Sequence, residues 1–233
     1  MQNKTSQNYE IGVESKWKGT FRAGGVSSMG TGVSFFIALI AISLFGTGSS
    51  GSMNVHLTSI GARPTFWLLA YGALITGAIL AIPCLFSIYL ALKNAGRAIT
   101  ATAVGITAFA MPVYIVGLVQ ALTLVSLGNM YNSSTGATQT AYLAAASETI
   151  SSWQILQGIG VLIAAVGIIL LSVVLVNDPF FGKALGYLGF ATGILTFPSF
   201  DSGIFLALAT VLFGIWFIAI GWKLIKAGSD RRN

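Results

Sequence analysis

The side chains that carry out acid–base, nucleophilic or metal chemistry are scarce in this sequence. Among 233 residues there are twelve Lys and Arg, six Asp and Glu, one His and one Cys. Metal and haem sites need several His, Cys or carboxylate ligands, which His56 and Cys84 alone do not supply. No Lys lies in the middle of an apolar block, so a retinal Schiff base is excluded as well. We therefore expect a protein that is not an enzyme, with no catalytic residue, no metal and no cofactor.

Uncharged polar side chains are what the apolar blocks contain in place of ionisable ones. The glutamines Gln120, Gln154 and Gln157 lie near the facing ends of the third and fourth blocks, and Tyr114 lies within the third. One interpretation is that these groups form hydrogen bonds between helices, which is common in membrane bundles. The other is a small cavity near the outer membrane surface, which would suit a neutral or lipid-like ligand. The residues alone leave both interpretations open.

The stretch KALGYLGFATGILTFP, residues 183–198, carries a face of small residues. Gly189 and Gly193 are four residues apart and Gly186 precedes Gly193 by seven, so the three share one side of a helix. A phosphate-binding loop would need such glycines at a turn between a strand and a helix, whereas these lie inside an apolar run. We predict a helix-packing face. Its partner is either a neighbouring helix or the same helix in a second subunit.

The composition places the chain among integral membrane proteins. Hydrophobic residues make up 55% of it and charged residues 8%, whereas a soluble domain has roughly 25% charged residues. Six blocks are long enough to cross about 30 Å of hydrocarbon. These blocks are apolar on every side, whereas apolar and polar residues alternate along a barrel strand. The pattern therefore indicates helices. The predicted fold class is all-α, a polytopic integral membrane bundle of six transmembrane helices at about 28–47, 66–92, 98–127, 153–176, 184–200 and 204–225.

The remaining segments divide the chain around this domain of residues 28–226. Residues 1–27 form a cytoplasmic amino-terminal segment that can lie on the membrane surface, and residues 227–233 form a basic cytoplasmic tail. The largely polar stretch before the first block predicts that no signal peptide is removed. Pro83 and Pro112 interrupt the second and third spans, as hinges or as fixed bends. The alanines of TAYLAAASETISS favour a helical approach to the fourth span.

The basic residues orient the six spans. If the chain crosses the membrane six times, eleven of the twelve Lys and Arg lie on one side of the membrane and only Arg63 lies on the other. The positive-inside rule then places both termini in the cytoplasm. The net charge of +6 reflects this bias and the attraction of anionic lipid headgroups, not nucleic-acid binding. The expected surroundings are therefore a lipid bilayer.

Four segments resemble a known family. They are ESKWKGTFRAGG before the first span, AIPCLFSIYLALK closing the second, KALGYLGFATGILTF opening the fifth, and GIWFIAIGWKL in the sixth. The matching positions are Trp17, Gly24, Gly25, Pro83, Tyr89, Gly186, Gly189, Trp216 and Gly221. They are similar to the prokaryotic six-span membrane proteins of the domain of unknown function 4386 family. The resemblance covers nearly the whole chain and implies a prokaryotic plasma membrane, but it brings no established activity.

Two functions from different classes follow from these observations. The first is a non-catalytic membrane protein that works through helix contacts, as a homo-oligomer or as an accessory or scaffold subunit of a membrane complex. The glycine face and the lack of buried charge favour it. The alternative is a binder or transporter of a small neutral or lipophilic molecule. The two mid-span prolines and the uncharged polar groups favour that one.

Overall fold

The protein is built from helices throughout the part that the structure describes. The computed structural model describes residues 17–45, 52–200 and 203–229. The elements are α1 (Lys18–Phe45), α2 (Met53–Ala62), α3 (Pro64–Asn132), α4 (Gly136–Asn177), α5 (Lys183–Thr196), the 3-10 turn η2 (Phe197–Phe200) and α6 (Gly203–Ser229). No strand occurs among these residues. The all-α prediction is therefore confirmed.

Four of the described helices, α1, α3, α4 and α6, are long and apolar enough to cross a membrane. The predicted second and third spans both lie within α3, which has 69 residues. At Gly96 the backbone leaves the helical region, with φ −177° and ψ 71°, and this residue divides α3 into two arms. Pro83 and Pro112 lie inside the two arms, which continue through them. Whether either proline acts as a hinge remains a prediction.

The fifth predicted span is the shortest of the six helical segments that match a predicted span. α5 has 14 residues, which at about 1.5 Å per residue gives roughly 21 Å. The 3-10 turn η2 follows it directly and extends the segment to Phe200. Six helical segments thus coincide with the six predicted blocks, once α3 is counted as two arms.

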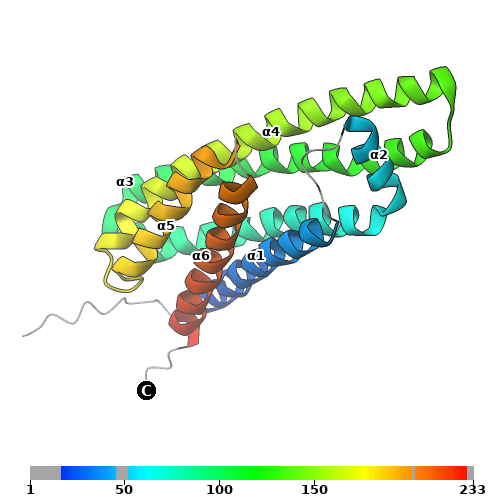
Figure 1. Cartoon of the computed structure of the whole chain (residues 1–233). Coiled ribbons are helices and arrows are strands. Elements are labelled where there is room, and N and C mark those ends of the chain that lie inside the picture. Colours follow the sequence, from blue (N-terminus) through cyan, green and yellow to red (C-terminus); the bar gives the residue numbers. More distant parts are fainter. Residues whose placement is uncertain (1–16, 46–51, 201–202, 230–233) are drawn as a thin grey trace, which may run out of the picture.

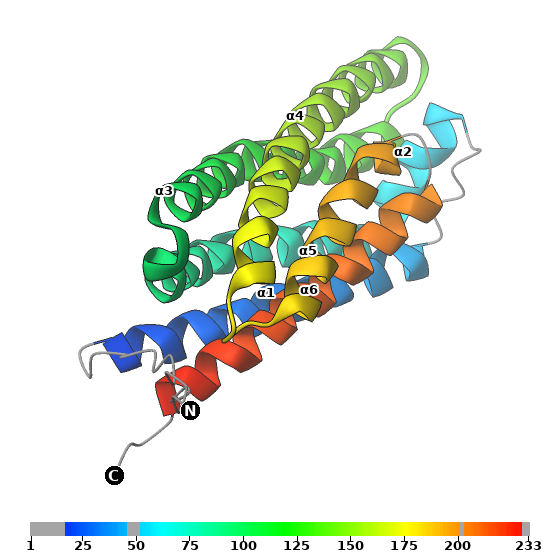
Figure 2. The same cartoon turned by 90° about the vertical axis from the view of Figure 1, so that its left-hand side faces the viewer.

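The six segments pack in a closed order (Figure 2). α1 lies between the first arm of α3 and α6, and α5 lies between α6 and α4. The second arm of α3 lies against α4 and completes the bundle. We call the end with the α3 bend and the α4–α5 loop the basic end. The opposite end holds α2 and the turn that joins α3 to α4 into a helical hairpin, and we call it the hairpin end. α1 begins and α6 finishes at the basic end (Figure 1).

Close backbone approach holds the first and last helices together. A Cβ atom on Gly25 of α1 would lie 2.8 Å from the carbonyl oxygen of Gly221, and one on Gly221 would lie 2.6 Å from that of Gly25. One heptad away, a Cβ on Gly32 would lie 2.5 Å from the Gly214 oxygen. No real side chain fits at such distances. The two antiparallel helices therefore depend on these four glycines for their packing.

Several helices extend further than the predicted spans. α1 begins at Lys18 rather than near residue 28, so residues 18–27 belong to the first helix and Phe21 is buried. Residues 1–16, the remainder of the amino-terminal segment predicted at 1–27, lie outside the described residues, as does the end of the basic tail from residue 230. α6 continues to Ser229. Both terminal helices therefore continue beyond the apolar blocks at the basic end.

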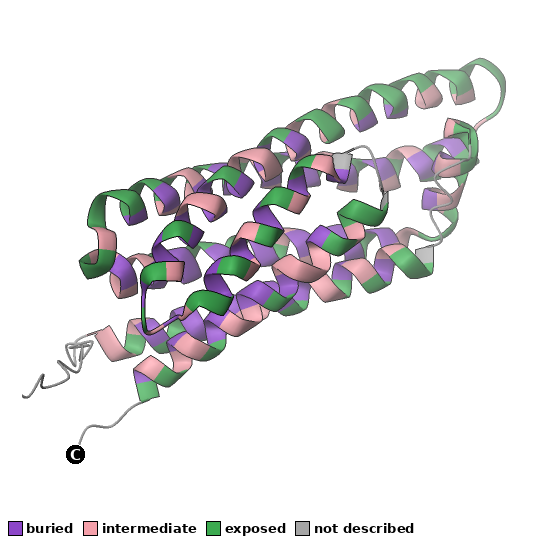
Figure 3. Cartoon of the chain, turned by 60° about the vertical axis from the view of Figure 1, so that its left-hand side comes forward, coloured by how far each residue is buried: buried purple, intermediate pink, exposed green. Residues whose placement is uncertain are grey.

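The largest extension is the helical hairpin of residues 128–152. α4 has 42 residues, about 63 Å at 1.5 Å per residue, which is twice the thickness of the hydrocarbon core. α4 and the end of α3 project together beyond the other long helices (Figure 1), and the tip of the hairpin is mostly exposed (Figure 3). The expected helical approach to the fourth span is thus present. It begins at Gly136.

Candidate functional site

Two of the predicted site residues meet where α3 crosses α4. A Cβ on Gly160 would lie 2.8 Å from the backbone nitrogen of Tyr114, and one on Gly117 would lie 2.8 Å from that of Gln157. The two helices therefore touch through their backbones at this crossing. Tyr114 is buried and Gln157 is half-buried. Both residues therefore lie at this close crossing, each opposite a glycine of the other helix.

The other two predicted residues lie one turn nearer the hairpin end. The antiparallel register that pairs position 117 with 157 and 114 with 160 places Gln120 level with Gln154. Gln154 is exposed and Gln120 is half-buried. The structure thus brings all four residues to one stretch of α3 and α4. Only Tyr114 and Gln157 lie at the close crossing.

Beside this crossing is a cluster of aromatic rings from three helices, which we call the aromatic cluster. It consists of His56 on α2, Trp67 and Tyr71 on α3, and Trp153 on α4. The ring centroids of Trp67 and Tyr71 are 4.5 Å apart, those of Tyr71 and Trp153 are 5.3 Å apart, and those of Trp67 and Trp153 are 6.0 Å apart. His56 meets Trp67 edge-on at 5.6 Å. These are the distances of aromatic rings in direct contact.

The two indole N–H groups of the cluster differ in their hydrogen bonding. Trp67 Nε1 donates to the carbonyl oxygen of Ala121 at 2.6 Å. Trp153 Nε1 is buried and has no acceptor among the described residues. A buried donor without an acceptor costs about 1–3 kcal/mol. An acceptor brought to Trp153 by a bound molecule would recover that free energy.

Charge is almost absent from the aromatic cluster. His56 is its one ionisable member besides tyrosine, and burial lowers the pKa of its imidazole below the usual 6.5. The imidazole is therefore neutral at pH 7. Within the described part of the chain, no three His, Cys, Asp or Glu side chains lie close enough together to hold a metal ion. The cluster is thus suited to a neutral molecule.

The aromatic cluster was not predicted from the sequence. Trp67 and Trp153 have the positions of interface anchors, at the predicted outer ends of two spans, yet Trp67 is only 3% exposed and packs within the aromatic cluster. One signal was available, because Trp67 and Tyr71 are four residues apart and share a helix face. The contact of both with Trp153 depends on the bend at Gly96, which returns α3 alongside its first arm.

The glycine face of α5 packs against α4 of the same chain. A Cβ on Gly186 would lie 2.7 Å from the Val176 nitrogen, and one on Gly193 would lie 2.5 Å from Cγ1 of Ile169. A Cβ on Gly189 would meet Ser172 of α4 and would lie 2.8 Å from the indole nitrogen of Trp216 on α6. The three glycines therefore accommodate neighbouring helices within one molecule. No second subunit is needed to fill this face.

Long apolar helices packed in a bundle define an all-α protein of membrane type. The chain belongs to the family described as domain of unknown function DUF4386, which it matches over residues 25–222. The resemblance noted in the sequence is therefore confirmed. No curated protein and no solved structure matches the chain.

Proposed function

We propose that this protein is a non-catalytic membrane protein that binds a small neutral or lipophilic molecule at the hairpin end of its bundle. The observation that carries the proposal is the buried Trp153 N–H, which has no acceptor among the described residues and lies within the aromatic cluster. Tyr114 and Gln157 add polar groups at the adjacent helix crossing. Ligand sites are typically apolar with a few well-placed polar groups.

The chemistry of the aromatic cluster restricts the ligand. Its apolar rings favour an apolar body, and the indole N–H requires a hydrogen-bond acceptor such as a carbonyl, ester or ether oxygen. The neutral His56 offers no charge to attract an anion. We therefore propose a lipid-like ligand with an uncharged oxygen acceptor.

Replacing Trp153 tests this proposal. Trp153→Phe keeps an aromatic ring and removes the N–H, so the occupancy of a copurifying small molecule should fall about tenfold. The measurement is native mass spectrometry of the protein released from nanodiscs made of its own membrane. Trp222→Phe is the matched control, because Trp222 is 65% exposed on α6, away from the aromatic cluster. Equal occupancy in both variants, or no bound mass in the unmodified protein, would contradict the proposal.

A second candidate function is that of an accessory or scaffold subunit, or a homo-oligomer. The projecting hairpin of residues 128–152 favours it, because α4 is about twice as long as the hydrocarbon core is thick and the mostly exposed tip of the hairpin is accessible to a partner. Glu148 is its single charged residue, so a partner would meet an almost uncharged surface of Ser, Thr, Asn, Gln and Ala. Cross-linking from Thr138→Cys in membranes would capture such a partner. If the protein stays at the mass of the monomer after cross-linking, that result would argue against this candidate.

We further propose that the six segments all cross a prokaryotic plasma membrane with both termini in the cytoplasm. The distribution of Lys and Arg supports this orientation. The hairpin would then lie outside the cell, and the aromatic cluster would face the outer leaflet.

A further inference from the structure

The basic end of the bundle gathers cations from four segments of the chain. The described ones are Lys18, Arg22, Lys93, Arg97, Lys183, Lys223 and Lys226. One carboxylate, Asp178 in the α4–α5 loop, accompanies them among the described residues of this end. Its side chain is only 8% exposed, and its Oδ1 accepts hydrogen bonds from the backbone N–H groups of Phe180 and Phe181 at 3.0 and 3.1 Å. The carboxylate is thus engaged in shaping its loop.

Two of these lysines are held in place by uncharged groups. Lys223 Nζ donates to the carbonyl oxygen of Phe180 at 3.1 Å and lies 5.9 Å from the centroid of the Phe180 ring. Lys93 Nζ lies 5.9 Å from the centroid of the Trp17 ring. A carbonyl or an aromatic ring orients an ammonium group and leaves its net charge in place. Both lysines are also half-buried, so their stems are less free to move than those of exposed lysines.

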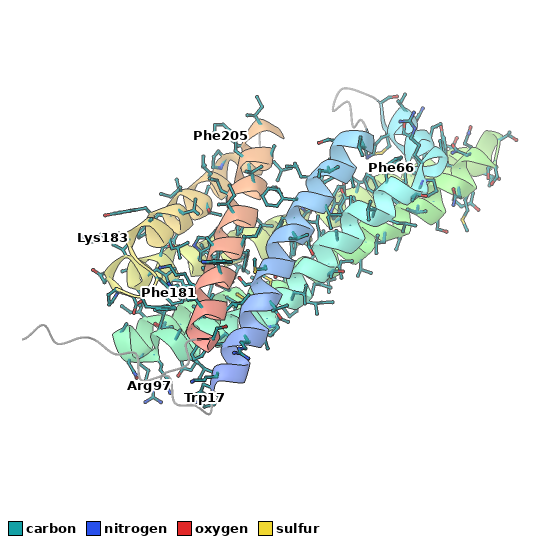
Figure 4. All side chains as sticks on the ribbon, turned by 90° about the horizontal axis from the view of Figure 1, so that it is seen from below. Trp17, Phe66, Arg97, Phe181, Lys183 and Phe205 are labelled. Atoms are coloured by element: carbon teal, nitrogen blue, oxygen red, sulfur yellow. The ribbon has the colours of Figure 1, made fainter. Side chains whose placement is uncertain are left out.

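Tryptophan accompanies each of these two lysines. Trp17 lies under Lys93, and Trp222, 65% exposed, is the neighbour of Lys223 in the sequence. Tryptophan is enriched at the level of lipid headgroups. Lys93 lies at Trp17, at the start of α1, whereas Lys223 lies at Phe180 in the α4–α5 loop, whose next residue Phe181 is seen apart from Trp17 in Figure 4. The two lysines therefore occupy two separate places at the basic end, each beside an aromatic ring.

We propose that the basic end binds the headgroup phosphates of anionic phospholipids at two positions, one at Trp17 and Lys93 and one at Phe180 and Lys223. Each position combines an oriented ammonium group with an aromatic ring at headgroup level. The lipid chains would then lie along the exposed apolar residues of the adjoining helices. This site is at the opposite end of the bundle from the aromatic cluster.

The test uses the full-length protein in nanodiscs made of equal parts phosphatidylcholine and phosphatidylglycerol. Native mass spectrometry then gives the ratio of the two lipids that remain bound. The double variant Lys93→Gln with Lys223→Gln should lower the retained phosphatidylglycerol about tenfold, since each cation near the surface contributes to the attraction of anionic lipid. The matched control is Lys183→Gln with Lys226→Gln, which removes the same charge from two exposed positions. Its effect should be several times smaller.

Further results also test the proposal. Lys93→Arg with Lys223→Arg should retain the lipid, which also separates loss of the site from loss of the fold. Equal losses in the two glutamine pairs would overturn the assignment, because binding would then follow total charge alone. A wild-type protein that retains both lipids equally, or that binds inorganic phosphate without preferring phosphatidylglycerol, would overturn the proposal itself.

Discussion

Single hydroxyl groups illustrate how the bundle satisfies its polar atoms. Thr107 Oγ1, buried in α3, donates to the carbonyl oxygen of Ala103, four residues earlier, at 2.8 Å. Thr100 is equally buried, but its Oγ1 has no partner among the described residues. The residue four positions before Thr100 is Gly96, where the helical backbone is interrupted. The bend that returns α3 alongside itself therefore removes the usual local acceptor of this hydroxyl.

Thr100→Val should consequently stabilise the protein. Valine keeps the branched shape and removes the unpaired hydroxyl, whose burial costs about 1–3 kcal/mol. Thr107→Val, in contrast, removes a hydroxyl that has an acceptor, and it should cost about 0.5–1.5 kcal/mol. Thermal unfolding in a mild detergent measures both variants. A loss of stability in Thr100→Val as large as that in Thr107→Val would show that Thr100 has a partner in the membrane.

At the scale of helices, small residues determine which elements can touch. Gly186, Gly189 and Gly193 allow α5 to approach α4, and Gly189 also leaves room for Trp216, whose indole N–H donates to the Leu185 carbonyl oxygen at 3.2 Å. Trp216 is fully buried. A short helix of 14 residues thus has both of its neighbours in close contact.

Gly189→Leu should therefore destabilise the single chain. The new side chain would collide with Ser172 and with the indole of Trp216, and such overpacking typically costs about 1–3 kcal/mol. Gly105→Leu is the matched control, because a Cβ at Gly105 meets nothing within 4 Å. Thermal unfolding and native mass spectrometry report stability and subunit number together. Loss of an oligomer in Gly189→Leu with unchanged stability would instead indicate a contact between chains.

The helices were easier to predict than their contacts. Blocks such as residues 153–176 are apolar on every side, and the thickness of the hydrocarbon core sets how long a spanning helix must be. The extensions at Lys18 and Gly136 were harder, because helix continues into water wherever local propensity and packing allow it. The aromatic cluster could not be derived, since it needs the α3 bend and the α3–α4 register at once. Gly25 with Gly221, although at regular spacing, could not be paired across nearly the whole chain without coordinates.

For the whole molecule, the two ends differ in charge and shape. The basic end has cations at the α3 bend, at the start of α1 and α5 and near the end of α6, while the hairpin end has an extended surface with few charges. Retention of Lys and Arg on the cytoplasmic side during insertion would orient such a molecule in one way only. The phosphate positions at the basic end would then face the inner leaflet.

Cysteine labelling in intact cells tests this orientation. Cys84 is fully buried, so the natural thiol should stay unlabelled and serve as an internal blank. Thr138→Cys, exposed on the hairpin, should react with a membrane-impermeant maleimide in intact cells. Lys183→Cys, exposed at the basic end, should react only after the cells are opened. The reverse pattern would place the basic end outside. Labelling of both positions in intact cells would mean that the segment between them does not cross the membrane an odd number of times.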